Sequence, residues 1–108
     1  MTKKEVLRAV DRSIEHWLRD IVMPLELGKC YGDHYGDSCP LCNIFYDKND
    51  SCIGCPLFII DGHCGVSKNS TWGKFNMEGT LCNSKATVTK LVEVRLFTEK
   101  QPEGEWKC

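Results

Sequence analysis

Two Cys-x-x-Cys pairs, Cys39-Pro40-Leu41-Cys42 and Cys52-Ile53-Gly54-Cys55, decide the fold that the sequence predicts. Two thiolates two residues apart can reach one metal ion from a single tight turn, and a second pair completes the tetrahedron that zinc prefers. Nine residues separate the pairs, against a usual gap of about 15–20 residues. We therefore expect two knuckles within residues 39–65, joined by a compact excursion, and zinc bound by Cys39, Cys42, Cys52 and Cys55.

Nearby residues leave the ligand set partly open. His63 and Cys64 follow the second pair closely, and either could replace a knuckle cysteine. A second, weaker site could be formed by Cys30, His34, Cys64 and Cys82. A lone cysteine is usually a small buried or exposed thiol, and we favour this simpler interpretation for Cys30, Cys82 and Cys108.

The composition predicts one folded domain in a reducing compartment. The 108 residues suit a single domain, and 42% hydrophobic with 27% charged residues is typical of a globular protein. The N-terminal segment MTKKEVLRAVDRSIEHW has no apolar signal run, and no stretch approaches the length of a membrane span. We therefore expect a cytoplasmic protein without a membrane partner, whose thiols bind metal rather than form a disulfide framework.

Residues 2–22 are predicted to form one amphipathic helix that packs on the zinc-binding region. Thr2 and Glu5 make a capping box at its start, and Pro24 should end the helix at about Val22 or Met23. The residues expected to be buried recur at helical spacing: Val6, Leu7, Val10, Ile14, Trp17, Leu18 and Ile21.

The opposite face of this helix is a candidate binding surface. Basic and acidic side chains three or four residues apart align along a helix axis, and here they are Glu5, Arg8, Arg12, Glu15, His16 and Arg19. The basic members, Arg8, Arg12, His16 and Arg19, could contact phosphates or a partner protein. The alternative is a solvated face on which glutamates and arginines pair with each other.

Aromatic residues supply the other predicted contacts. Within the glycine- and aspartate-rich loop 28–38, Tyr31-Gly32-Asp33 is echoed by Tyr35-Gly36-Asp37. The repeat either presents Tyr31 and Tyr35 to a partner or marks two successive turns. Trp72 stands three residues before Phe75, which indicates a helical turn with an aromatic face.

The last third of the chain fits two periodicities. Ser84 can cap a helix over residues 84–98, but Val88, Val92, Val94 and Leu96 also alternate as in a strand. Residues 100–108 are expected to be a loose tail. Together these elements predict a small, metal-stabilised α+β fold, in which the N-terminal helix packs on the double knuckle and a helix or strand completes the domain.

The motifs resemble those of a group of small phage and prophage proteins that are treated as zinc-binding. The resemblance covers roughly residues 10–75 and is carried by these segments in order: His16-Trp17, Cys39-Pro40-Leu41-Cys42, Cys52-x-Gly54-Cys55-Pro56-Leu57, Gly62-x-Cys64-Gly65 and Trp72. It implies a mobile-element origin, a metal site and an intracellular setting, and it implies no enzyme activity. The last third of the chain departs from the pattern.

No catalytic motif accompanies the cysteines. A site of four cysteines leaves no open position for water, and the chain has no His-Glu-x-x-His helix and no His-x-Glu partner for a deaminase. We therefore predict a protein without enzymatic activity that binds a host protein through its aromatic and charged surface. The alternative is a nucleic-acid or nucleotide binder that uses the arginines and loop aromatics, although the net charge of −1 does not favour it.

Overall fold

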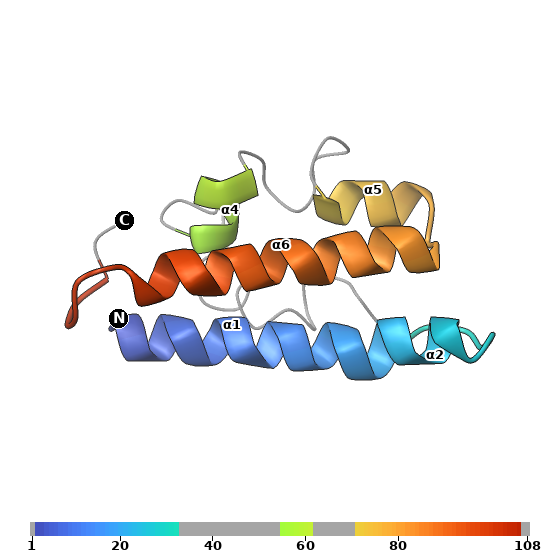
Figure 1. Cartoon of the computed structure of the whole chain (residues 1–108), viewed down its shortest axis with the longest axis horizontal. Coiled ribbons are helices and arrows are strands. Elements are labelled where there is room, and N and C mark those ends of the chain that lie inside the picture. The colour runs from blue at the N-terminus through green and yellow to red at the C-terminus, as the bar shows by residue number, and fades with distance from the viewer. Residues whose placement is uncertain (1, 33–54, 62–70, 107–108) are drawn as a thin grey trace, which may run out of the picture.

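The computed structural model describes residues 2–32, 55–61 and 71–106. Every regular element in these ranges is helical, and the elements in chain order are α1 (Lys3–Trp17), η1 (Leu18–Val22), α2 (Met23–Glu26), α4 (Pro56–Asp61), α5 (Thr71–Met77) and α6 (Leu81–Glu99) (Figure 1). The predicted α+β class is therefore wrong: the described residues contain no strand or sheet, and extended pairing among them is limited to an isolated bridge between Thr2 and Glu105.

Helix α6 resolves the ambiguity over residues 84–98 in favour of a helix. It begins at Leu81, earlier than expected, because Thr80 rather than Ser84 is its N-cap and the Thr80 side chain accepts a hydrogen bond from the Asn83 N–H at 3.1 Å. The β-branched residues that suggested a strand are divided between two faces of this helix. Val94 is fully buried while Val92 is exposed.

The first helix begins as predicted but continues past its expected end. The Thr2 hydroxyl accepts a hydrogen bond from the Glu5 N–H at 3.2 Å, which confirms Thr2 as the N-cap. A proline within an α-helix lacks an N–H, and its ring clashes with the carbonyl four residues earlier. Here the wider π-helical turn η1 directly precedes α2, and the chain stays helical to Glu26 with Pro24 in the first turn of α2.

The loop after α2 supplies a hydrogen-bond donor to the Asp20 carbonyl, to which Pro24 cannot donate because it has no N–H. The Gly32 N–H donates to the Asp20 carbonyl at 2.6 Å. Gly28, with φ of 70°, reverses the chain, and the Lys29 N–H donates to the Pro24 carbonyl at 2.8 Å, as in a glycine-terminated helix end. The loop therefore runs back along η1 instead of leaving the domain.

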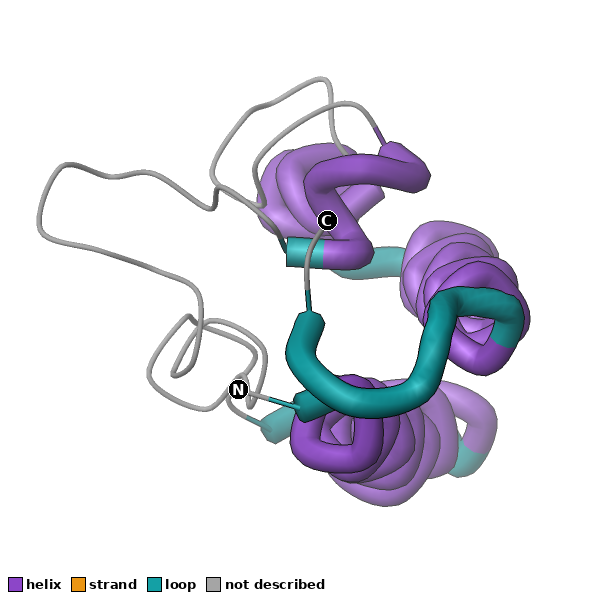
Figure 2. Tube along the Cα trace, turned by 90° about the vertical axis from the view of Figure 1, so that its left-hand side faces the viewer, coloured by secondary structure: helices purple, strands orange, loops and turns teal. Residues whose placement is uncertain are grey.

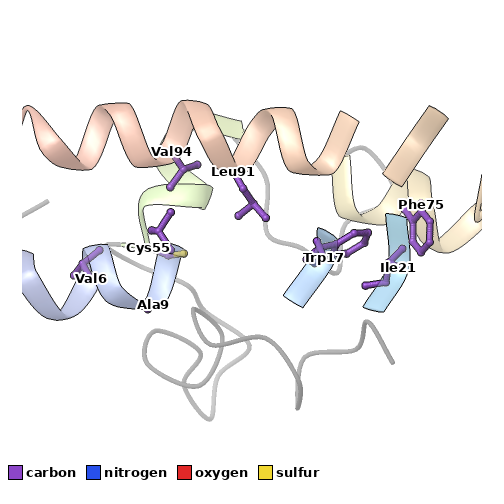
Figure 3. Close-up of a cluster of buried hydrophobic side chains, with 9 residues drawn as sticks. Val6, Ala9, Trp17, Ile21, Cys55, Phe75, Leu91 and Val94 are labelled. Carbon is purple, nitrogen blue, oxygen red and sulfur yellow. The ribbon is translucent and has the colours of Figure 1, made fainter. Parts of the chain in front are cut away.

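The core lies between α1–η1 and α6, and α4 and α5 close it from the other side (Figures 1 and 2). Its buried members come from all of these helices and include Val6, Ala9, Val10, Trp17, Ile21, Cys55, Phe75, Leu91 and Val94. Figure 3 shows Cys55, the residue before α4, beside Val94. It also shows Phe75 of α5 near Trp17 and Ile21. The Trp17 and Phe75 rings meet edge to face with centroids 5.0 Å apart.

The two ends of the chain are held together, so residues 100–106 are not a loose tail. Lys3 is buried, and its ammonium donates to the Glu99 carbonyl at 2.7 Å and to the Glu103 carboxylate at 3.0 Å. A cation at the C-terminus of α6 also complements the helix dipole. The Lys3 N–H donates to the Gly104 carbonyl at 2.8 Å, and Trp106 packs against the core.

Leu91 and Leu27 provide a matched pair to test where the core lies. Leu91 is fully buried between α1 and α6, whereas Leu27 is 65% exposed. We expect Leu91→Ala to lower the free energy of unfolding by about 2–5 kcal/mol, because it leaves a cavity, and Leu27→Ala to change it by no more than about 0.5 kcal/mol. Urea denaturation measures both, and equal losses for the two variants would contradict this core.

Candidate functional site

Only one of the predicted zinc ligands lies in the described part of the chain. Cys55 is 4% exposed and belongs to the core cluster between α1, α4 and α6 (Figure 3). The other first-choice ligands and the two possible substitutes lie outside the described residues: Cys39, Cys42, Cys52, His63 and Cys64. Within residues 2–32, 55–61 and 71–106, no group of three or more histidine, cysteine or acidic side chains could hold a metal ion.

The burial of Cys55 bears on what the zinc would do. Zinc binds the thiolate form of cysteine and compensates its charge, and a buried thiolate needs that compensation. Cys55 therefore fits a zinc site only as a ligand at the edge of the core, with the remaining ligands supplied by the knuckle residues. In that arrangement the second knuckle would end directly on the packing surface of α1 and α6. Zinc binding stays a prediction.

The remaining described cysteines are exposed. Cys30, in the loop after α2, and Cys82, in the first turn of α6, are free thiols. This agrees with the simpler interpretation of both residues. Cys108 and His34 lie outside the described residues.

On the predicted basic face, the acidic side chains are in direct contact with the basic ones. His16 Nδ1–H donates to Asp20 Oδ2 at 2.9 Å, and the Arg19 guanidinium donates to both oxygens of Asp20 at 3.1 Å. The same guanidinium lies 3.4 Å from Glu15. The C-terminal half of the face is thus a cluster of paired charges, the arrangement that the solvated alternative predicts.

These pairs shift the titration of Asp20 and Arg19. Hydrogen bonds from the Arg19 guanidinium, aided by those from His16, hold the pKa of Asp20 below its ordinary value of 3.8, against a smaller opposing effect of burial. The carboxylate in turn raises the pKa of Arg19. Arg12 and Arg8 are exposed about two and three turns before Arg19 on the same helix. The face therefore becomes less basic toward its C-terminal end.

Tyr31 is brought next to this cluster by the loop after α2. Its ring meets Phe75 with centroids 5.1 Å apart, and its side chain is 39% exposed. A Cβ on Gly79 would lie 2.7 Å from the Tyr31 hydroxyl oxygen, so glycine is needed where the α5–α6 turn approaches the ring. Because Gly32 is bonded to Asp20, two of the predicted binding elements, the helix face and Tyr31, lie on neighbouring segments.

The other two predicted aromatic contacts are not tested. Trp72 lies in α5, which confirms the helical turn indicated by its spacing from Phe75, but the structure does not describe its side chain. Tyr35 lies outside the described residues.

Sequence reasoning missed an exposed apolar strip formed by Leu18, Met23 and Leu27. Leu18 was expected in the core, yet these side chains are 44%, 55% and 65% exposed. They lie on successive turns, because the Met23 N–H donates to the Leu18 carbonyl and the Leu27 N–H to the Met23 carbonyl. The step of five residues in η1 aligns Leu18 with Met23, which the 3.6-residue period does not do. The sequence signal that could have indicated this irregular turn was Pro24, which lies inside an apolar pattern of helical spacing.

Comparison with known proteins gives partial similarity to several curated proteins. No family model matches the chain, and no solved structure matches it. A methionine–tRNA ligase of Burkholderia vietnamiensis is 32% identical over 85 residues, which is 78% of this chain. The chain spans 12% of the length of that relative. In the described residues, no helix is both long and apolar enough to cross a membrane.

The zinc prediction can be tested on the ligands and on an exposed control. We expect native mass spectrometry to find bound zinc, and chelation to unfold the chain, since a structural zinc contributes on the order of 10 kcal/mol. Cys39→Ser and Cys52→Ser should lose both zinc and circular dichroism, while Cys82→Ser should keep both. A chelated, reduced sample with an unchanged melting temperature would show that no such metal supports the fold.

The lowered pKa of Asp20 predicts a specific acid sensitivity. The stabilisation it contributes is complete above the ordinary pKa of 3.8 and is lost as the pH falls through the lower pKa of the folded protein. Asp20→Asn removes this titration while keeping an oxygen that accepts from His16. The melting temperature of the wild type should therefore fall more steeply than that of Asp20→Asn between about pH 4 and pH 2. Parallel curves would show that the Asp20 contacts do not stabilise the fold.

Proposed function

We propose that this chain is a small zinc-braced protein without enzymatic activity that binds another protein, a host factor in the intracellular setting implied by the phage-like motifs. The observation that carries this proposal is the exposed apolar strip of Leu18, Met23 and Leu27. Three large apolar side chains in contact with water on successive helical turns favour burial against a partner.

The shape of the strip supports one mode of binding. A helix that projects apolar side chains from one face is recognised by an apolar groove, which buries each anchor in turn. Here the anchors increase in exposure toward the helix end, from Leu18 to Leu27. We therefore expect the partner to offer an apolar groove that receives the end of the α1–η1–α2 helix.

The surroundings of the strip also suit a protein partner. Arg19, held by Glu15 and Asp20, is the neighbour of Leu18 in the chain, and Glu26, bonded to Lys85 at 3.3 Å, is the neighbour of Leu27. An apolar centre with a mixed, hydrogen-bonded rim is the usual anatomy of a protein interface, in which methionine and arginine are enriched. A phosphate that approached Arg19 would instead be repelled by the Asp20 carboxylate, which is already bonded to that guanidinium.

The similarity to a methionine–tRNA ligase favours the alternative, a nucleic-acid binder, because the name of that relative states a tRNA substrate. In this alternative the contacts would come from Arg8 and Arg12, the two exposed arginines at the N-terminal half of the face, with Tyr31 stacking on a base. The net charge of −1 and the pairing of Arg19 with acids weaken it.

Capture from a bacterial lysate with matched variants tests the proposal. We expect the immobilised wild type to retain a host protein, and Leu18→Gln/Leu27→Gln to reduce the retained amount by at least about tenfold, since each lost anchor costs about 1–2 kcal/mol. Met77→Gln changes an exposed apolar side chain on α5, away from the strip, and should retain the protein as the wild type does.

Two outcomes would decide against a protein partner at the strip. Equal retention by all three proteins would show that the strip is not the contact. A gel shift with tRNA that weakens steeply with salt, and is lost in Arg8→Gln/Arg12→Gln, would establish the nucleic-acid alternative.

A further inference from the structure

Helix α6 carries large apolar side chains on the side that faces solvent. Val92 is 44% exposed and Leu96 is 53% exposed, and they lie four residues apart on adjacent turns. We call Lys85, Thr89, Val92, Leu96 and Glu99 the α6 outer face. In Figure 2, α6 forms one side of the molecule, flanked by α1 and by α4 and α5, so a second molecule could approach this face along its whole length.

The residues on the buried face of α6 fix the orientation of the helix, and so they keep Val92 and Leu96 exposed. Its buried residues include three with hydroxyls, which bond to carbonyls of their own helix: Ser84 to Leu81 at 2.7 Å, Thr87 to Asn83 at 3.1 Å and Thr98 to Val94 at 2.7 Å. These small, internally satisfied side chains suit close packing of α6 on the core. The helix therefore cannot turn Val92 and Leu96 inward without exposing Leu91 and Val94.

The charges on the α6 outer face are complementary to themselves. Lys85 and Glu99 lie seven residues before and seven residues after Val92, and within one molecule Lys85 pairs with Glu26 and Glu99 pairs with Arg95. All four side chains are part-exposed, so each pair can also meet the opposite charge of a second copy. Antiparallel pairing of two α6 helices about a two-fold axis at Val92 sets each Lys85 opposite the other copy's Glu99, and sets Leu96 opposite Val88, one residue before Thr89. Parallel pairing would set Lys85 against Lys85 and would also align the helix dipoles.

We propose that a second copy of this chain docks on the α6 outer face, with the two α6 helices antiparallel and the two-fold axis at Val92. The contact spans the fifteen residues from Lys85 to Glu99, about 22 Å of helix. An interface of one helix pair is at the small end of the range for specific complexes, so the dimer forms in a concentration-dependent way. This inference does not rest on the proposed function, because its apolar side chains belong to a different helix from the apolar strip; the two surfaces share only Lys85, which holds Glu26 beside Leu27.

Sedimentation velocity on the full chain, in reducing buffer and over a range of protein concentrations, tests the apolar part of the contact. The wild type should shift from monomer toward dimer as its concentration rises. Val92→Gln/Leu96→Gln should remain monomeric at the highest concentration, and Leu18→Gln/Leu27→Gln should dimerise as the wild type does. Circular dichroism confirms that each variant is folded. A monomeric wild type, or a dimeric Val92→Gln/Leu96→Gln variant, would overturn the proposal.

Charge reversal tests the direction and register of the pair. Lys85→Glu alone sets two acids opposite each other, and Glu99→Lys alone sets two bases opposite each other, so each variant should be monomeric by itself. An equimolar mixture of the two should form a heterodimer, because every contact at both ends then joins opposite charges. The double variant Lys85→Glu/Glu99→Lys should dimerise with itself. A mixture that stays monomeric while the wild type dimerises would exclude this antiparallel register.

Discussion

Pro24 has no N–H to give to the carbonyl of Asp20, and the arrangement of this end of the molecule follows from that constraint. The helix passes Pro24 through the wider turn of η1, and the Gly32 N–H takes the place of the missing donor at 2.6 Å. This hydrogen bond holds the loop with Tyr31 against the helix, and the wide turn places Met23 on the exposed side that Leu18 already faces.

The other end of the molecule is closed by a charge rather than by a turn. Lys3 is buried at the C-terminal end of α6, where its ammonium donates to the Glu99 carbonyl. Between the two ends, α1 and α6 share a core that also includes Cys55, the residue before α4, and Phe75 of α5. Because Cys55 is also a predicted zinc ligand, metal and core would support each other: the ion would fix the segment whose last residue fills the space between α1 and α6.

The two proposed surfaces differ in the chemistry that they present. The apolar strip on η1 and α2 ends in a chain reversal and projects its anchors beyond the helix pair, as suits insertion into a groove of a different molecule. The α6 outer face is longer, interrupted by Thr89 and bounded by opposite charges, as suits an identical copy. Their separation on different helices allows a dimer to present two strips, and two weak contacts to one assembly would reinforce each other.

Periodicity and capping chemistry in the sequence determined the first helix, its Thr2 cap, the exposed basic face and the turn of helix at Trp72, because these depend on residues within one or two turns. The cysteine spacing predicted zinc and, from it, an α+β fold; the described residues are helical, since knuckle spacing says nothing about the remaining elements. Leu18 was misplaced because it follows the buried Trp17 by one residue, about 100° around the helix, which carries it out of the buried stripe. Burial of Lys3 by residues 99–104, and of Cys55 by α1 and α6, was decided only by the tertiary structure, because both contacts join segments far apart in the chain.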